Sequence, residues 1–432
     1  MSLEGDSAAD LPSPINGALA SSVLPHQQPT SICVSRSFAS AGALVAFLRS
    51  MPPHPSLTDL DLSHCSGEAT LHPAETGALL RSLEGALRSM PSLKSLSLEG
   101  NRIFGATPHP LTGTSTEALT AFTRMLCESS VTQLNVSDTL LIGSSGRQLT
   151  GLASLCENFI AVQAVSLIAS HNSLHSLAIS MIAKTLHSTH RLTHLDLSHN
   201  LCTRDGAGCR SVSGLLDLTK GLLNNHSIRH LDLGYCGLHD EDMALLCSAL
   251  EKMPQLEYLS VAGNQCQGQG MFGISGLLTH HSLLRPAMGI RHINLSSNPI
   301  GDNVLALRPG LETSETLIQL DVVNCLLDDV SAESLLVALG RNFTLTRLNF
   351  SENAVGEQVS DAISAEIKGN GLLKQIISSP YDIDVTTLEA QVWRVDTHRH
   401  CPKVISCTSG LLRGRWKAEA STIRHSARVA PE

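Results

Sequence analysis

The 432-residue sequence is poor in aromatic residues and in charge, and it has no long apolar segment. Trp, Tyr and Phe together make up 3% of the chain, while Asp, Glu, Lys and Arg make up 16% with a net charge of -9. Charge this dilute argues against a nucleic-acid-binding protein. No stretch reaches the roughly 18 to 20 consecutive apolar residues that span a bilayer, so we expect no membrane insertion.

The sequence also lacks the signs of secretion. Residues 1–15 carry acids and prolines where a secretory signal has a positive start and an apolar run. The 12 cysteines are scattered without dense pairing, as expected in a reducing compartment, where they remain small buried thiols. We therefore expect an intracellular, cytoplasmic protein without a disulfide framework.

What the sequence does contain is one nine-residue phrase, L-x-x-L-x-L-x-x-N/C, that recurs along most of the chain. The clear copies begin at Leu57, Leu93, Leu192, Ile228, Leu256, Ile290, Leu317 and Leu345, weaker ones at Val131 and Val162, and a degenerate one at Leu373. An upstream pair, Ile32 and Val34, is expected to form a first strand. The shortest spacings, about 28 residues, leave room for one strand, one helix and two connections of ordinary length.

The phrase and its period resemble leucine-rich repeat proteins, and Asn and Cys sharing the ninth position resemble their ribonuclease-inhibitor-like subclass. The resemblance covers residues 30–380. It implies an α/β leucine-rich repeat solenoid (horseshoe) of about ten to twelve repeats, with a parallel sheet on the concave face and helices on the convex face. Because side chains alternate along a strand, positions four and six enter the core while positions three and five face the concave side. The ninth-position amides are expected to pair backbone groups of the adjacent repeat.

The two ends depart from the repeat. Residues 1–29 contain prolines and no periodicity, which predicts a flexible leader. Residues 30–380 form the predicted ribonuclease-inhibitor-like domain. Residues 381–432 are predicted to form a C-terminal cap and a basic tail, because residues 391–432 hold eight Lys or Arg against three acids. Its cationic and aromatic side chains, such as Arg415 and Trp416, suit an acidic surface of a partner.

Between the phrases, apolar residues recur at helical spacing, for example over residues 243–250. Asp240 and Ser331 are predicted to be N-caps of the helices that follow them. Gly340 and Gly369 are predicted to end helices in a left-handed conformation. Residues 105–116 and 265–273 are predicted to be surface insertions on the convex side.

The predicted concave face carries polar and ring-bearing side chains in columns, one per repeat position. Column five is predicted to be polar throughout, and column three contains imidazoles and a phenol in successive repeats. The predicted partner-binding residues are His194, Asp196, Arg229, His230, Asp232, Tyr235, Tyr258, Arg291, His292, Asp321 and Arg347. Tyr and Arg dominate interface hot spots, so this face predicts a non-enzymatic recognition or scaffold protein that binds a macromolecular partner there. The shortage of aromatics predicts a contact spread over many repeats.

Two arrangements on this face resemble chemical sites. His194, His230, Asp196 and Asp232 offer zinc-type ligands, but an open sheet lacks the outer hydrogen bonds that metal sites need, so solvated side chains are favoured. Ser260 with His230 and Asp232 suggests a hydrolase, but a sheltered pocket and oxyanion donors are missing. We therefore expect no enzyme activity, no metal and no cofactor.

Two further motifs lie off the sheet. Gly268, Gly270 and Gly273 spell G-x-G-x-x-G, yet no acid follows at the tip of the next strand, so a glycine-rich loop is predicted in place of a nucleotide site. In the tail, residues 398–407 hold two His and two Cys, at a spacing that does not match a zinc knuckle.

The resemblance leaves two other functions open. Ran GTPase-activating proteins share this repeat class, which implies a small-GTPase regulator, although that family typically ends in an acidic tail and this chain ends in a basic one. Repeats of this class also occur in ciliary axonemes, which implies a structural component of a cytoskeletal or ciliary assembly. The basic tail suits contact with an acidic filament.

Overall fold

The computed structural model describes residues 29–67, 71–104, 114–142, 149–284 and 288–378. Within these ranges, 11 short strands form one sheet whose strand order follows the chain, and every neighbouring pair is parallel. The strands are β1 (Ser31–Cys33), β2 (Asp59–Asp61), β3 (Ser95–Ser97), β4 (Gln133–Asn135), β5 (Ser166–Ile168), β6 (His194–Asp196), β7 (His230–Asp232), β8 (Tyr258–Ser260), β9 (His292–Asn294), β10 (Gln319–Asp321) and β11 (Arg347–Asn349).

Helical segments connect the strands, as parallel pairing requires. The helices are α2 (Ala41–Ser50), α3 (Pro73–Arg88), α4 (Thr114–Glu128), α5 (Leu149–Ser154), α6 (Ser176–Leu186), α7 (Ser213–Leu223), α8 (Asp240–Leu250), α9 (Gly268–Leu284), α10 (Arg308–Thr313), α11 (Asp329–Leu339) and α12 (Glu357–Ser378). A π-helix, η1 (Leu155–Ile160), extends α5, and a 3-10 helix, η2 (Gly301–Leu307), precedes α10.

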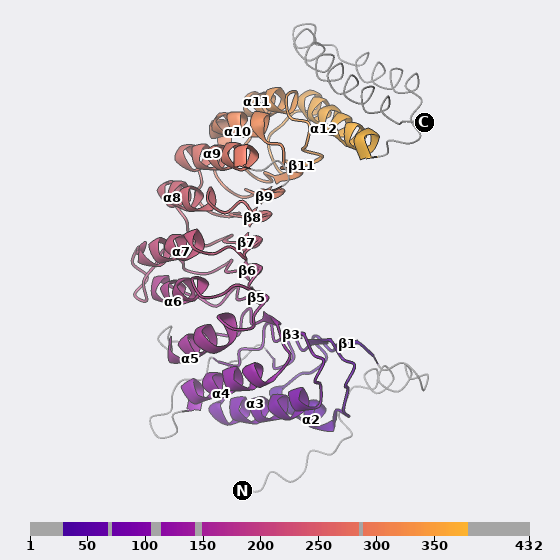
Figure 1. Ribbon diagram of the computed structural model, residues 1–432, viewed down its shortest axis with the longest axis vertical. Helices are drawn as coiled ribbons and strands as arrows, with labels where there is room; N and C mark the ends of the chain where they lie inside the picture. Colours follow the sequence, from indigo (N-terminus) through magenta and orange to yellow (C-terminus); the bar gives the residue numbers. More distant parts are fainter. Residues whose placement is uncertain (1–28, 68–70, 105–113, 143–148, 285–287, 379–432) are drawn as a thin grey trace, which may run out of the picture.

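The sheet and the helices form two layers of an arc. Figure 1 shows the strands along the inner side and the helices along the outer side. Neighbouring strands lie about 4.8 Å apart, whereas packed helices need 8–10 Å, so each repeat is a wedge and the stack curves toward the sheet. The prediction of a leucine-rich repeat solenoid with a concave parallel sheet is confirmed.

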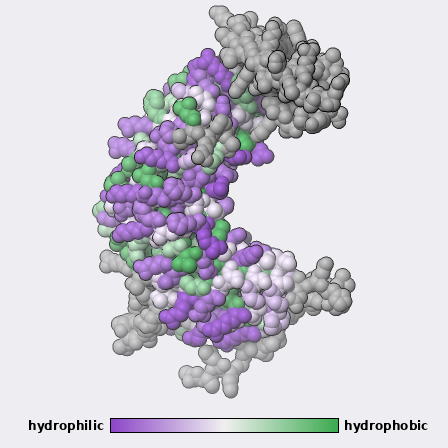
Figure 2. All heavy atoms as spheres, in the orientation of Figure 1, coloured by the Kyte–Doolittle hydropathy of each residue, from purple (hydrophilic) through white to green (hydrophobic). Residues whose placement is uncertain are grey.

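One continuous core runs between the layers. Leucines at positions four and six of the phrase, such as Leu231 and Leu233 of the β7 repeat, are fully buried. The upstream pair also forms the predicted first strand, because β1 places Ile32 opposite Leu60 of β2. Hydrophilic side chains cover much of the surface in view in Figure 2, including the inner side of the arc. The pattern of leucines thus sets which face of each strand is inside.

The register predicted for one weak copy is wrong by two residues. The copy that contains β5 begins at Ala164 in place of Val162, since Leu167 aligns with Leu195 and Ile168 with Asp196. Val162 is 63% exposed, whereas Ala164 is fully buried. Column five is therefore not polar throughout. A two-residue shift keeps the alternation of inward and outward side chains, so the apolar pattern alone did not distinguish the two registers.

Buried amides join successive repeats as predicted. The Asn101 side-chain oxygen accepts the N–H groups of Cys65 and Ser66 in the preceding repeat, and its amide donates to the carbonyl of Leu62. Cysteine fills the ninth position elsewhere, and there it is an inert buried thiol. Burial raises the pKa of the Cys325 thiol to about 11.

The predicted N-caps are wrong by one or more residues. His239 caps α8 and Asp328 caps α11, so Asp240 and Ser331 lie inside the first turn of their helices. The Asp240 carboxylate instead accepts N–H groups of residues 267, 269 and 270 at 2.7–2.8 Å, which caps the next helix, α9. A carboxylate placed just past the start of one helix can reach its neighbour because consecutive helices pack side by side.

The segment 265–273 is not an insertion, and its three glycines do not form a loop. All three lie in α9, and the neighbouring Cys266 and Met271 are buried. Of the predicted insertion at 105–116, residues 114–116 belong to α4, and residues 105–113 lie outside the described residues.

Two predictions about the end of the domain are also wrong. Gly340 is right-handed, with φ of -60°, so it does not end α11 in a left-handed turn. Gly369 and Leu373 both lie inside α12, so no strand forms at the degenerate last copy. The predicted leader and the predicted cap and tail, with its His and Cys residues, lie outside the described residues except for residue 29.

Candidate functional site

Four rings of column three form a ladder across the middle of the concave face, which we call the inner ladder. Its members are His194, His230, Tyr258 and His292, which are consecutive partners in the register of β6 to β9. Successive ring centroids lie 5.2, 3.8 and 4.7 Å apart. The first two pairs are stacked and the last is edge to face. All four were predicted site residues, and the structure brings them together.

Three more rings form a second ladder where the strands end, which we call the rim ladder. His171, His199 and Tyr235 stack with centroid separations of 4.0 and 4.3 Å. All three occupy position eight of the phrase. Sequence reasoning found Tyr235 but missed the two histidines, because it read columns two, three and five only and because the register of the β5 repeat was shifted.

The rim ladder depends on an unusual backbone conformation. His171, His199 and Tyr235 have φ of 54–55°, the left-handed region that disfavours side chains with a Cβ. The following repeat has Gly263 at this position, and a Cβ there would collide with the Tyr235 ring. The ring therefore lies over the glycine, and its hydroxyl reaches 3.5 Å from the Ser297 hydroxyl.

Carboxylates of column five stand on the same face. Asp196 and Asp232 are partners in register on β6 and β7. One oxygen of each accepts an N–H group two residues on, from Ser198 and Gly234, at 2.8 Å. Burial and the nearby charge of Asp196 raise the pKa of Asp232. These polar side chains of column five therefore have a structural role, because they accept N–H groups of the turn after the strand.

The other predicted anchors are distributed unevenly. His292 lies 2.5 Å from the Asp321 carboxylate, and Arg229 is paired with Glu257 at 2.8 Å. Arg291 is exposed at position two before β9, whereas Arg347 is exposed on β11, three strands beyond Tyr258. The predicted residues therefore concentrate on β6 to β10 and leave Arg347 apart. Their role in binding stays a prediction.

The geometry does not favour the zinc or hydrolase arrangements. The rings of His194 and His230 are stacked with planes 22° apart, so their in-plane nitrogen lone pairs do not converge on one ion. In the described ranges, no group of three or more His, Cys, Asp or Glu side chains could hold a metal. Ser260 is buried, and its hydroxyl hydrogen-bonds with the side chains of Asp232 and Tyr258.

The stacked position of His230 makes stability depend on pH. Burial and the neighbouring His194 lower the pKa of His230 to about 4. An unfolded chain then binds this proton at higher pH than the folded one, so the stabilisation is present above about pH 6.5 and is lost as the pH falls toward 4. We expect His230→Gln to remove about 1 kcal/mol of the loss in unfolding free energy between pH 7.5 and 5.5.

Urea unfolding at the two pH values, followed by circular dichroism, measures this difference. His226→Gln is the matched control, since the His226 side chain is exposed. It should leave the pH dependence unchanged. An equal effect of the two variants would contradict the assignment.

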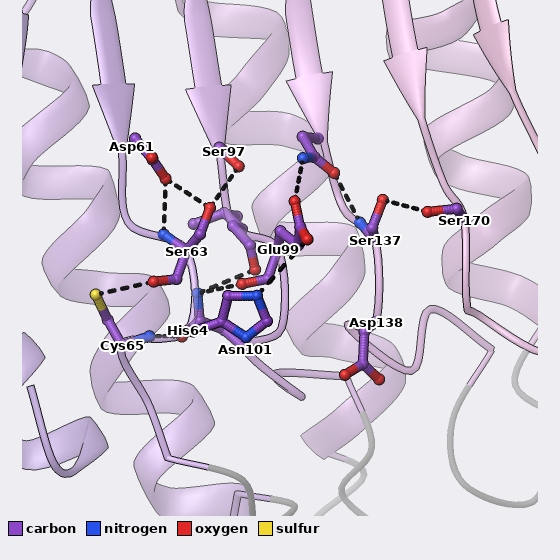
Figure 3. A network of polar contacts seen from close by, with 12 residues as sticks. Asp61, Ser63, His64, Cys65, Ser97, Glu99, Asn101, Ser137, Asp138 and Ser170 are labelled. Carbon is purple, nitrogen blue, oxygen red and sulfur yellow. Dashed lines mark hydrogen bonds and ion pairs between the residues drawn. The ribbon is translucent and has the colours of Figure 1, made fainter. Parts of the chain in front are cut away.

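The N-terminal repeats have a different concave surface. Figure 3 shows short polar side chains at the ends of β2 to β5 that satisfy one another. The Ser63 hydroxyl bonds with Asp61 and with Ser97 at 2.5 and 2.8 Å, and the Asn135 amide donates to Glu99 at 2.9 Å. These polar groups are occupied within the chain, whereas His194 of the inner ladder and Tyr235 of the rim ladder have exposed side chains.

Comparisons with known proteins agree with the repeats. A family described as "Leucine Rich repeat" matches residues 224–247. The chain is 27% identical over 285 residues to human "NACHT, LRR and PYD domains-containing protein 5", covering 64% of this chain and 21% of that protein. It is 27% identical over 212 residues to mouse "Centrosomal protein of 78 kDa", covering 41% and 27%.

Among solved structures, the leucine-rich repeat-containing protein LegL7 from Legionella pneumophila aligns with a TM-score of 0.45 and 18% identity over 78% of this chain and 98% of that one. The chain spans only about a fifth of its first curated relative. The family match does not separate subclasses, so the ribonuclease-inhibitor-like subclass stays a prediction. In the described part of the chain, no helix is both long and apolar enough to cross a membrane.

Proposed function

We propose that the chain, which is a leucine-rich repeat protein, is a non-enzymatic recognition or scaffold module that binds a protein partner on its concave face. The observation that carries this proposal is the pair of ring ladders, which set seven aromatic side chains on one open face of a sheet. Tyrosine is among the residues that dominate interface hot spots, and each ladder contains one, Tyr258 or Tyr235.

The ladders also change the expected form of the contact. Low aromatic content predicted a contact spread over many repeats, yet the rings lie on the consecutive repeats of β5 to β9. Each ring is held by its neighbour, so binding a partner would order few additional side-chain rotamers. Tyr235 remains 47% exposed in this arrangement and is therefore available to a partner. We expect a local binding site centred on β6 to β8.

A photo-crosslinking residue tests this location. We expect benzoyl-phenylalanine at Tyr258 to crosslink the full chain to a partner protein in cells, because this ring is at the centre of the inner ladder. The crosslinked species would be identified by mass spectrometry. Leu283 on α9 is the matched control position, since its side chain is 79% exposed on the convex side.

The comparison of the two positions decides the outcome. A partner captured from position 258 and not from 283 supports the concave face. A partner captured only from position 283 would contradict the proposal and favour a binding site on the convex helices.

A cytoskeletal assignment is a second candidate, and one observation favours it: a relative is named as a centrosomal protein. Under this reading the chain is intracellular and part of a cytoskeletal or ciliary assembly. Immunofluorescence of the full chain against a centriolar marker tests it, and a uniformly cytoplasmic signal would count against it. Regulation of a small GTPase remains an expectation from the resemblance alone.

A further inference from the structure

We infer that the ring-lined concave face recognises an arginine-bearing extended segment of a partner protein, and that the guanidinium stacks on the inner ladder at the position above Ser166. This inference rests on the proposed function and specifies the chemistry of its partner.

The inner ladder has an open end at β5. The His194 ring stacks on the ring of His230, on the β7 side. On the β5 side, the residue in register with His194 is Ser166, whose side chain is small and polar. Adjacent strands lie about 4.8 Å apart, close to the ring separations within the ladder. A planar group above Ser166 would therefore extend the stack by one step. His194 is exposed, so this ring face is accessible.

Charge at this end of the ladder suits a cation. Asp196 follows His194 by two residues on the same face of β6, and Asp232 is its partner on β7. One oxygen of each carboxylate accepts a turn N–H group, and Asp232 also hydrogen-bonds with the Ser260 hydroxyl. Asp196, on the strand next to Ser166, is therefore the carboxylate that supplies an acceptor oxygen to the ligand. In the described columns two, three and five of β4 to β8, Arg229 is the one Lys or Arg, and it is already paired with Glu257.

Arginine fits this arrangement better than lysine. Its guanidinium is planar, stacks on ring faces and forms two parallel hydrogen bonds with carboxylates, whereas an ammonium is a compact point charge. Burial and the nearby His171 lower the pKa of His199, and the pKa of His230 is about 4. These two rings are therefore neutral near pH 7 and do not repel a cation. A protein segment is favoured as the source because an extended chain can follow the curved face.

The test measures binding of a fluorescein-labelled peptide, Gly-Ser-Arg-Gly-Arg-Gly-Ser, to the full chain by fluorescence anisotropy at 0.15 M salt. We expect micromolar affinity, weaker binding of the version with Lys for Arg, and no binding of the version with Glu. Asp196→Asn with Asp232→Asn should weaken the Arg peptide at least tenfold. Folding should survive, because Asn naturally occupies column five at Asn135 and Asn294 and accepts the same turn N–H group.

A matched double variant removes the same charge elsewhere on the chain. Asp59→Asn with Glu352→Gln changes two acids on β2 and beyond β11, and it should alter binding less than twofold. Ser166→Arg supplies a guanidinium from the chain itself and should weaken the peptide at least tenfold. Thermal unfolding confirms that each variant is folded.

Four results would overturn the inference. Equal losses in the two double variants would mean attraction by net charge alone. No difference between Arg and Lys peptides, together with full binding to Ser166→Arg, would remove the stacking site. Binding that appears only after R413E, R415E and K417E would mean that the chain's own tail occupies the face. Absence of peptide binding, alongside a partner crosslinked at position 258, would reject arginine recognition and keep the proposed function.

Discussion

Replacing Asn264 by Ala is expected to lower the free energy of unfolding by about 3 to 5 kcal/mol, because several buried backbone groups lose their partner at once. The Asn264 oxygen accepts the N–H groups of Cys236 and Leu238 at 3.1 and 3.0 Å. Its amide donates to the carbonyls of Leu233 and Val261 at 3.0 and 2.9 Å. Urea unfolding monitored by circular dichroism measures the change.

Two further variants test whether the loss of these hydrogen bonds causes the expected destabilisation. Asn264→Cys should cost less than Asn264→Ala, since Cys at this position can still donate to the preceding repeat, as Cys236 does to the Leu197 carbonyl at 3.1 Å. Asn224→Ala removes an exposed amide that bonds within its own helix, and it should change stability by less than about 0.5 kcal/mol. A loss below 1 kcal/mol for Asn264→Ala would mean that water replaces the amide.

Replacing Gly214 by Val is expected to lower the unfolding free energy by about 2 to 3 kcal/mol through overpacking between α6 and α7. A Cβ at Gly214 would collide with the backbone carbonyl of Ser176, and the Gly214 N–H donates to the Ser176 hydroxyl at 2.7 Å. Gly221, two turns on, faces Ala183 in the same way. The helices can relieve the clash only by separating, which also opens the core beneath them.

Gly85→Ala is the matched control in a helix. A Cβ there meets nothing within 4 Å, so this change should stabilise the chain by up to about 1 kcal/mol through the unfolded state. Denaturation midpoints of the two variants and the parent measure the contrast. A neutral Gly214→Val would show that α6 and α7 are not held at this separation.

Local sequence and structure agree wherever one repeat position has one physical role. Leucine at positions four and six fills the core of its repeat, and Asn at position nine bonds backbone groups of the adjacent repeat. Because each role is the same from repeat to repeat, the residue type recurs and the role can be predicted from the sequence. Errors occurred where the deciding contact comes from the neighbouring helix. Asp240 was predicted to cap its own helix and instead caps α9. The three glycines from Gly268 were predicted to be a loop because the close packing of Gly270 and Gly273 against α8 is not visible in sequence.

The candidate site was predicted in the same partial way. The inner ladder follows from the period, because residues of one column become neighbours once the strands pair. The rim ladder does not, because it requires a left-handed residue after the strand and a glycine in the next repeat that leaves space for the Tyr235 ring. The wrong register for the repeat of β5 also hid His171. Asn172 fits position nine of the phrase, and this match would have given the correct register.

The amino-acid sequence alone predicted the repeat, the parallel order of the strands, the buried leucines and most of the polar concave positions, because each follows from a period that recurs along the chain. The tertiary structure decided which rings stack, which carboxylates are held by turns, and that the ladder ends in an open ring face above Ser166. Those features depend on distances between neighbouring repeats, and such distances are set by packing across the whole sheet and its helices.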